Sequence, residues 1–275
     1  MPLRRLSLLG LVVLTLAVVG LVLATQRVRG PQWRTLRPGL EFTTIHGAPF
    51  CRRGSANIAV LRVDPRRFRV GVRHFSTGAG EKPPGVLGWL QSSGALAVFN
   101  AGQYYPDLSY MGLLVSDGQA ISKRRHPEYQ AALVAEPAGG GRKARVIDLT
   151  DERIELPEWR EVAQSFMLFD RSGALRVRRT DRVANRTIVG EDPHGRLLVV
   201  TTEGGYKLWE LAELLRKGSL DLTHAMCMDG GAEAKMLVRT ERFRYASFGP
   251  WNGEDGALMP GADVPLPAVI TVTPR

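Results

Sequence analysis

Several short segments of the sequence end apolar runs with side chains that can bind ligands or transfer protons. In one of them an apolar run ends in Asp229, Gly230 and Gly231. Two successive glycines permit positive φ angles and a close approach of the backbone to a ligand. An earlier run delivers Asn100 into a turn of small residues that includes Gly102. We therefore expect the Asn100 amide and the Asp229 carboxylate to face a cleft.

Another segment contributes a guanidinium group, because Arg186 opens the apolar run 187–190. An arginine fork fits phosphate or carboxylate oxygens, carboxylates and amides hold sugar hydroxyls, and free glycine N–H groups stabilise a developing negative charge. This set of groups suits an anionic, hydroxyl-rich ligand. Asp-Gly-Gly after a strand is equally typical of a purely structural turn.

Short alternating or apolar runs bounded by turn residues position these segments. They predict strands over residues 57–63, 68–74, 95–100, 112–116, 131–135, 144–149, 166–169, 174–177, 196–202, 224–228, 234–239 and 268–272. Apolar residues at helical spacing predict a helix over 207–217 with Gly218 as its C-cap, and a shorter helix is expected over 84–91. Strands outnumber helices and no βαβ alternation is present. We expect an α+β single domain with mixed β-sheets and few helices.

The N-terminal residues 1–25 are typical of a membrane-targeting segment. Residues 6–24 carry no charge and, as a helix, reach about 28 Å, close to the thickness of a bilayer core. They predict an uncleaved transmembrane anchor or, alternatively, a cleaved signal peptide. Residues 26–50 are expected to form a linker and residues 51–275 the exported domain. The domain is then extracytoplasmic, in the periplasm or at the cell surface, and secreted if the segment is cleaved.

The net charge of the chain indicates which classes of binding partner to expect. The chain has 275 residues and a net charge of +10, which suits an anionic partner. No nucleic-acid-binding motif accompanies this charge, so nucleic acid is not an expected partner. A basic module that binds anionic lipid or nucleic acid through charge alone is a third hypothesis, and its affinity should fall steeply with salt.

Metals and disulfides receive little support from the sequence. The histidines lack the spacing of a metal site. Oxygen ligands at Asp229 and Glu203 would suit Ca²⁺ or Mg²⁺, but no loop motif supports such a site, and the sequence identifies no cofactor with certainty. The two cysteines, Cys51 and Cys227, are consistent with one disulfide in an oxidising compartment or with a buried free thiol at Cys227.

A series of short motifs in a fixed order resembles the phosphodiester glycosidase family. The resemblance extends from about Asn57 to Ile270. Its motifs are Asn-x-Gly-x-Tyr at 100–104, Gly-Leu-Leu-Val-Ser-Asp-Gly at 112–118, Gln-Ser at 164–165, Asn-Arg-Thr at 185–187, Leu-Leu-Val-Val at 197–200, Leu-x-Glu-Leu-Ala-Glu-Leu-Leu at 208–215 and Met-Asp-Gly-Gly at 228–231.

The resemblance implies hydrolysis of a sugar-1-phosphodiester at the glycosidic carbon, which leaves free sugar and a phosphomonoester. It implies that Arg186 clamps the phosphate and that Asp229 acts as acid and base or holds sugar hydroxyls. Glu203 is the candidate for the second carboxylate that glycoside hydrolysis commonly uses. The resemblance places further substrate-binding residues at Asn100, Gly102, Tyr104, Gln164, Gly230 and Gly231, although Tyr104 is equally consistent with aromatic core packing.

One departure from the family pattern follows Asp-Gly-Gly. Family members continue with Gly or Pro and then Ser, whereas this chain has Ala232, Glu233, Ala234 and Lys235. If the serine orients phosphate, then either Lys235 replaces it, or the substrate differs, or the protein no longer catalyses. We therefore add Glu233 and Lys235 to the substrate-binding candidates. The expected function is hydrolysis of a glycosyl phosphodiester or phosphate-linked envelope glycan. The alternative is a catalytically inactive glycan-binding protein of the same fold.

Overall fold

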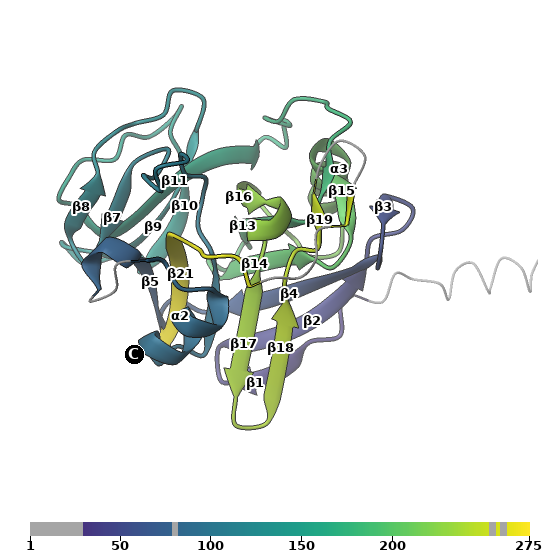
Figure 1. Ribbon diagram of the computed structural model, residues 1–275, viewed down its shortest axis with the longest axis horizontal. Helices are drawn as coiled ribbons and strands as arrows, with labels where there is room; N and C mark the ends of the chain where they lie inside the picture. Colours follow the sequence, from purple (N-terminus) through teal and green to yellow (C-terminus); the bar gives the residue numbers. More distant parts are fainter. Residues whose placement is uncertain (1–29, 79–81, 253–256, 259–262) are drawn as a thin grey trace, which may run out of the picture. The chain divides into compact units, whose positions relative to one another are not determined.

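Antiparallel strands are the main regular secondary structure of the computed structural model (Figure 1). The structure describes residues 30–78, 82–252, 257–258 and 263–275.

The chain divides into two units, Met1–Gln32 and Trp33–Arg275. The expected transmembrane or signal helix at residues 1–25 lies outside the described residues. Among the helices that are described, none has the length and apolar character needed to cross a membrane. The second unit contains all the described strands and helices.

The largest sheet carries most of the residues singled out in the sequence. Its strands are β1 (Arg34–Arg37), β2 (Leu40–His46), β4 (Asn57–Val63), β7 (Leu114–Ser116), β8 (Gln119–Ser122), β9 (Ala131–Pro137), β10 (Ala144–Asp148), β11 (Trp159–Phe169), β13 (Arg186–Glu191), β14 (Leu197–Thr202) and β16 (His224–Gly230). They follow the order β1-β2-β4-β14-β13-β16-β11-β7-β8, with β9 paired to both β11 and β10.

The other elements form smaller sheets and short helices. A second sheet has the order β18-β17-β6-β21-β5 and consists of β5 (Phe68–His74), β6 (Ala97–Asn100), β17 (Met236–Thr240), β18 (Phe243–Ser247) and β21 (Ala268–Pro274). The minor sheets contain β3 (Cys51–Arg53), β12 (Val183–Ala184) and β15 (Gly205–Lys207), and β19 (Trp251–Asn252) with β20 (Ala257–Leu258). The helical elements are η1 (Phe75–Thr77), α2 (Val86–Ser93), α3 (Leu208–Lys217) and η2 (Gly231–Glu233).

The fold is therefore mostly β, a single domain with two α-helices among the described residues. The predicted scarcity of helices and the lack of βαβ alternation are confirmed. The predicted mixed sheets are wrong, because every pairing between the described strands is antiparallel. Parallel neighbours need a crossover of a dozen or more residues, usually a helix, whereas short turns join antiparallel neighbours such as β13 and β14.

Two-residue alternation explains why the central strands are apolar along their whole length. In β4, Ile58 and Val60 pack in one core cluster together with Leu211 and Leu215 of α3. Leu61 faces the opposite way, into the cluster shared with the second sheet. Each fully buried side chain of this size contributes about 1.5–3 kcal/mol. The large sheet is thus covered on both faces, by α3 on one and by the second sheet on the other.

Residues 34–46, predicted as a linker, form β1 and β2 instead. Strand β2 pairs along its whole length with β4, from Leu40 opposite Val63 to His46 opposite Asn57. Gly39 has a φ of +84° in the tight turn between β1 and β2. Pro31, Pro38 and Pro49 interrupt this part of the sequence and make its strand pattern difficult to recognise. The second unit begins at Trp33 rather than at residue 51.

The predicted elements match the observed ones unevenly. The strands expected at 57–63 and 68–74 are found with those bounds, and α3 begins one residue after its predicted start. The strand expected over 166–169 is the end of the longer β11. The strand expected over 174–177 is wrong, because this segment contributes only one isolated bridge, from Leu175 to Phe169.

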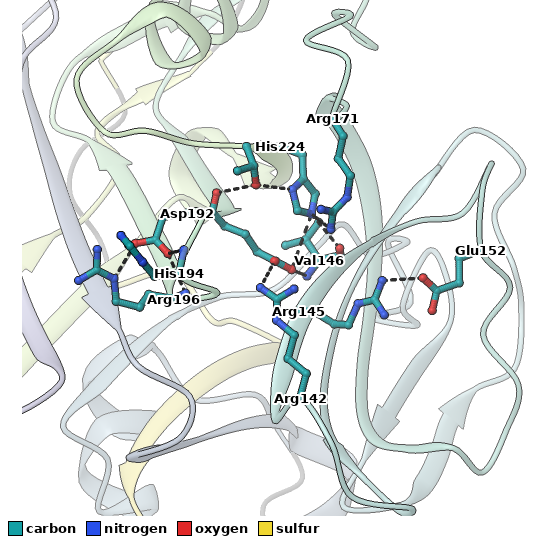
Figure 2. A network of polar contacts seen from close by, with 11 residues as sticks. Arg142, Arg145, Val146, Glu152, Arg171, Asp192, His194, Arg196 and His224 are labelled. Carbon is teal, nitrogen blue, oxygen red and sulfur yellow. Dashed lines mark hydrogen bonds and ion pairs between the residues drawn. The ribbon is translucent and has the colours of Figure 1, made fainter.

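A buried polar network ties β10 to β13 and β16 (Figure 2). Glu191 is 1% exposed and accepts hydrogen bonds from the Val146 N–H and the Arg142 guanidinium. The Nε2 atom of His224 lies 2.9 Å from the Val146 carbonyl oxygen. Burial lowers the pKa of His224, so its ring is neutral at pH 7. Strand β10 does not pair with β13 or β16 in the sheet. These side-chain contacts therefore connect the β9–β10 hairpin to β13 and β16.

We expect Glu191→Ala to lower the free energy of unfolding by about 3 kcal/mol, because a buried N–H and a guanidinium lose their acceptor. The matched control is Glu152→Ala, which removes a 44% exposed partner of Arg145. This control should cost less than about 1 kcal/mol. Chemical denaturation at pH 7 measures both losses. Equal losses in the two variants would contradict the role of Glu191.

Candidate active site

Asp229 occupies the end of β16, a strand that lies between β13 and β11 in the large sheet. The residues of β16 before it are buried, so the strand delivers one carboxyl group from the core to the edge of the sheet. The Asp229 N–H donates to the carbonyl oxygen of Ala101 at 3.1 Å. This bond brings the turn that follows β6 to the same place. Segments 100–104 and 229–233, far apart in the sequence, therefore meet here.

The Asp229 carboxyl group titrates near neutral pH. Burial raises its pKa to about 7, and the negative charge of Glu233 adds to the rise. A 2.8 Å hydrogen bond from the Gly230 N–H, one from the Gln103 side chain and the charge of Arg182 act in the opposite direction. Burial is the largest effect because it removes water from the charged form. Such a group can both donate and accept a proton at pH 7.

Glu233 supplies a second carboxylate beside Asp229. It lies in η2, the short turn after β16, where Gly231 adopts a φ of +74°. The Tyr104 hydroxyl donates to Glu233 Oε1 at 3.3 Å. Burial raises the pKa of Tyr104, and the charges of Glu233 and Asp229 raise it further, so the phenol stays a donor. The structure thus brings Tyr104, Asp229 and Glu233 together.

Arg186 lies on the other side of the Asp-Gly-Gly turn. Its side chain is buried, with Nε donating to the Tyr206 carbonyl oxygen at 3.4 Å and Nη2 donating to the Arg182 carbonyl oxygen at 3.1 Å. A Cβ atom added to Gly230 would lie 3.2 Å from Arg186 Nη1, so glycine is what lets the guanidinium approach the turn. Burial lowers the pKa of Arg186 but leaves it charged at pH 7. The residue also lines a pocket of about 630 Å³.

Two residues that were not predicted complete the surroundings of Asp229. The Gln103 side chain hydrogen-bonds the Asp229 carboxyl, and Tyr129 donates from its hydroxyl to Gln103 Oε1 at 2.6 Å. The Tyr129 ring packs between His126 and Phe166. Gln103 lies inside the Asn-x-Gly-x-Tyr motif, which could have indicated it. Nothing in the local sequence indicates Tyr129.

Asn100 was predicted to bind substrate, and the structure places its amide inside the scaffold. It is 2% exposed. Its Nδ2 donates to the carbonyl oxygens of Ala101 and Asp229, both at 3.0 Å, and its Oδ1 accepts from the Lys235 N–H at 3.1 Å. The side chain therefore positions the Asp229 turn against the end of β6.

Gln164, also predicted to bind substrate, has its amide engaged in the same way. Its Nε2 donates to the carbonyl oxygens of His126 and Tyr129 at 3.0 and 2.7 Å, and its Oε1 accepts from the N–H groups of Leu113 and His126 at 2.9 and 3.1 Å. Gln164 is 3% exposed. It holds the loop that carries Tyr129.

The glycines serve close packing rather than offering free N–H groups. The Gly230 N–H donates to Asp229 Oδ1, and the Gly231 N–H donates to the Asn185 carbonyl oxygen at 2.9 Å. This corrects the expectation that both N–H groups face the ligand. A Cβ atom on Gly102 would come within 2.4 Å of the Tyr110 hydroxyl, which receives the Gly102 N–H at 3.0 Å.

Glu203 lies in a hydrogen-bond group of its own. Its carboxylate accepts from Ser55 and Asn57 at 3.0 and 3.1 Å and from the Tyr245 hydroxyl at 3.2 Å. Asn57 begins β4, the neighbour of β14 in the sheet. Among the described residues, Glu203 makes no hydrogen bond or ion pair with Asp229, and the structure brings Glu233 close to Asp229 instead.

Lys235 forms an ion pair with Asp263 and also interacts electrostatically with Glu233. It is fully buried, and its Nζ lies 3.3 Å from Asp263 Oδ1. The same Asp263 oxygen accepts the Val86 N–H at the start of α2 at 3.0 Å. Lys235 thus links the segment after η2 to helix α2.

The described residues contain no group of three or more His, Cys, Asp or Glu side chains arranged to hold a metal ion. Both cysteines are free thiols: Cys51 is partly buried and Cys227 is buried in the middle of β16. The disulfide alternative for Cys51 and Cys227 is therefore not realised in this structure. Burial raises the pKa of Cys227 to about 12, so its thiol is not reactive at neutral pH.

The arrangement combines a carboxyl group whose pKa is raised to about 7, a neighbouring second carboxyl group and a buried guanidinium. A carboxyl group with such a pKa can exchange protons with a substrate and with water at neutral pH. The guanidinium can bind phosphate oxygens.

Comparisons with known proteins identify a matching family and two solved structures of similar fold. The sequence model of a family described as "Phosphodiester glycosidase" matches residues 93–270. No curated protein sequence matches the chain. One similar solved structure is the zebrafish N-acetylglucosamine-1-phosphodiester alpha-N-acetylglucosaminidase catalytic domain, auto-inhibited by its pro-peptide, at 15% identity and a TM-score of 0.61, covering 90% of this chain and 87% of that one. Another is a hypothetical protein from Synechocystis, at 12% identity and a TM-score of 0.61, covering 90% and 65%.

Proposed function

The chain belongs to the phosphodiester glycosidase family, and from this premise we propose that it hydrolyses a sugar-1-phosphodiester to free sugar and a phosphomonoester. The family match and the shared fold support a glycosyl phosphodiester hydrolase in general. The observation that carries the specific proposal is the position of the Asp229 carboxyl group, whose pKa is raised to about 7, separated from the buried Arg186 guanidinium by Gly230.

Asp229 is the general acid of the proposed reaction. It donates its proton to the oxygen that departs with the phosphate, while the bond from this oxygen to the anomeric carbon breaks. Water adds to the anomeric carbon and gives a proton to the Glu233 carboxylate. The products are the sugar with a new hydroxyl group and a phosphomonoester. Arg186 binds the phosphate oxygens through the donors that Tyr206 and Arg182 do not use.

Glu233 takes the role of second carboxylate for which the sequence favoured Glu203. The Tyr104 hydroxyl orients Glu233, whereas three other donors occupy Glu203. Gln103 and Tyr129 position the Asp229 carboxyl from the opposite side.

The cell envelope is the proposed place of action. This part of the proposal is supported by the uncharged run at residues 6–24, which is long enough for a membrane anchor or an export signal. The substrate would then be a phosphate-linked glycan or glycosyl phosphodiester outside the cytoplasm.

A glycan-binding protein without activity is the second candidate, and one observation favours it. Ala232, Glu233 and Ala234 stand where the family has Gly or Pro followed by Ser, and the Lys235 ammonium group is paired with Asp263. Binding without turnover of any sugar phosphodiester would support this candidate over the hydrolase.

The test is turnover of α- and β-linked sugar-1-phosphodiesters by the purified full-length protein in H₂¹⁸O. We expect ¹⁸O in the released sugar and none in the phosphomonoester, because water attacks carbon. Label in the phosphate would contradict cleavage at the glycosidic carbon.

The pH dependence tests the roles of the two carboxylates. The rate should fall as the pH rises through about 7, because Asp229 loses the proton that it must donate. Glu233→Gln removes a charge that raises the pKa of Asp229, so it should shift this fall to lower pH and also slow the reaction. The matched control Glu203→Gln should leave the position of the fall unchanged. If only Glu203→Gln shifted the pH at which the rate falls, Glu203 rather than Glu233 would be the second carboxylate.

A further inference from the structure

The hydroxyl group of Tyr129 faces the glutamine that contacts the proposed general acid. It lies 2.6 Å from Gln103 Oε1, whereas the weaker acceptor Met111 Sδ is 3.4 Å away. The backbone of Gln103 is fixed as well, because its carbonyl oxygen accepts the Met111 N–H at 2.9 Å. Two residues earlier in the chain, the Ala101 carbonyl oxygen accepts the Asp229 N–H at 3.1 Å. Printed backbone contacts thus hold Gln103 between Tyr129 and Asp229.

Tyr129 has little freedom to turn its hydroxyl elsewhere. The residue is 3% exposed, its ring stacks on His126 with centroids 4.0 Å apart, and the Phe166 ring packs against it at 4.3 Å. The Gln164 side chain donates to the Tyr129 carbonyl oxygen at 2.7 Å. Burial raises the pKa of Tyr129, so the phenol stays protonated and uncharged. Its effect on Asp229 therefore passes through a hydrogen bond rather than through a charge.

The Tyr129 hydroxyl selects one of the two orientations of the Gln103 amide. A carbonyl oxygen can only accept a hydrogen bond, whereas an amide NH₂ group can only donate one. With Oε1 bound to Tyr129, the NH₂ group is turned toward the Asp229 carboxyl, where its hydrogen bond lowers the pKa of Asp229. The reversed amide would present Oε1 to Asp229 and would accept the carboxyl proton.

This orientation decides what competes for the Asp229 proton. The Gly230 N–H donates to Asp229 Oδ1 at 2.8 Å. Gly230 and Gln103 therefore both offer hydrogens to the carboxyl group, and neither accepts one in this orientation. Neither neighbour competes with a substrate oxygen for the proton. A reversed Gln103 amide would bind the proton and keep the carboxyl group neutral at higher pH, because it stabilises the protonated form.

We propose that Tyr129 is a positioning residue that keeps the Gln103 amide turned so that the proton of Asp229 goes to the substrate rather than to the protein. This inference rests on the proposed role of Asp229 as general acid. Gln103 acts on Asp229 directly, and Tyr129 acts through Gln103.

Other groups also face the Asp229 carboxyl from neighbouring elements. The charge of Glu233 in η2 raises the pKa of Asp229, and that of Arg182 lowers it. Further electrostatic interactions with Asp229 come from Arg186 on β13, Cys227 on β16, Tyr104 and Tyr110. The test leaves all of these side chains in place and varies only Tyr129 and Gln103.

The test is an NMR titration of the full-length protein with ¹³C-labelled aspartate carboxyl groups, in which the Asp229 signal is identified by its loss in Asp229→Asn. Tyr129→Phe keeps the ring and removes only the hydroxyl. We expect Asp229 to titrate about one pH unit higher in this variant, which means a proton affinity about tenfold greater. Gln103→Met should act similarly, and Tyr129→Phe should have no further effect in the Gln103→Met background.

The rate should change together with the titration. With a sugar-1-phosphodiester as substrate, the fall in rate of Tyr129→Phe at rising pH should move upward by the same amount. Its kcat below this fall should be about tenfold lower, because Gln103 holds part of the proton that the substrate needs.

The matched control is Tyr245→Phe, which removes a phenol hydroxyl that donates to the Glu203 carboxylate at 3.2 Å. It should leave the Asp229 titration unchanged. An unchanged titration in Tyr129→Phe would overturn this inference, and so would a shift that persists in the Gln103→Met background. Full activity of Asp229→Asn beside a shifted titration in Tyr129→Phe would overturn the proposed general acid and keep the link between Tyr129 and Asp229.

Discussion

Asp229→Asn should abolish turnover and, at the same time, stabilise the folded protein at pH 8. Loss of the general acid is expected to lower kcat by about 10³-fold, at the upper part of the range for acid–base catalysis. The asparagine side chain has nearly the same shape and keeps an oxygen that can accept the Gly230 N–H. The loss in rate therefore reports the missing proton rather than a displaced turn.

The gain in stability follows from the direction of the pKa shift. The pKa of Asp229 rises from 3.8 in the unfolded chain to about 7 in the folded protein. Between these values the folded state binds the proton more tightly, so the wild type loses stability as the pH rises from about 4 to 7. The variant does not titrate here. It should be more stable by about 1–4 kcal/mol at pH 8 and no more stable at pH 3.5.

Asp64→Asn is the control with the opposite sign. Hydrogen bonds from Arg66 lower the pKa of Asp64. Asp64 therefore stabilises the fold above the pKa of the unfolded chain, and this variant should be less stable at pH 8 than at pH 3.5 relative to wild type. Urea unfolding at both pH values measures both variants. An Asp229→Asn protein that loses stability as the pH rises, relative to wild type, would contradict the protonated carboxyl.

Arg186→Lys is expected to lower kcat/KM by about 100-fold, because an ammonium group cannot replace the fork that binds two phosphate oxygens. It also cannot reach both the Tyr206 and the Arg182 carbonyl oxygens that orient the guanidinium. Titration with a phosphomonoester should show a matching loss of affinity. The titration separates loss of phosphate binding from loss of stability alone.

Arg62→Lys is the matched control, because Arg62 is a partly buried arginine outside the candidate active site. Arg62 pairs with Glu41 and lies over the Trp33 ring. Its replacement should cost stability without lowering kcat/KM. Activity of Arg186→Lys within threefold of wild type, with phosphomonoester affinity retained, would reduce Arg186 to a structural residue.

The sequence predicted which strand ends lie close together better than it predicted what each side chain at these ends contacts. Asn100, Tyr104, Asp229 and Arg186 were singled out, and sheet pairing brings them around one turn. A polar residue at a strand end has two possible partners, a ligand or the backbone of a neighbouring segment. Only the tertiary fold decides between them, and for Asn100 the backbone is the partner.

The choice of the second carboxylate depended on strand order. Glu203 directly follows β14, whose neighbour β4 begins with its hydrogen-bond partner Asn57. The sequence does not show that β4 lies beside β14, so it could not indicate that the Glu203 carboxylate is already occupied by donors. The linker prediction failed for a related reason. Strand β2 is recognisable only once its pairing with β4 buries Leu40 and Phe42.

Asp229 is carried by a central strand of the large sheet, so the catalytic residue and the residues around it differ in how freely they can be substituted during evolution. The carboxyl group is carried by a strand with hydrogen-bonded neighbours on both sides and cores on both faces, and few substitutions there preserve the fold. Gln103 and Tyr129, which surround the carboxyl group, lie on connecting segments, which tolerate substitution and insertion. Relatives can therefore keep one reaction while exchanging the segments that select the substrate. Within such a lineage, specificity should diverge faster than chemistry.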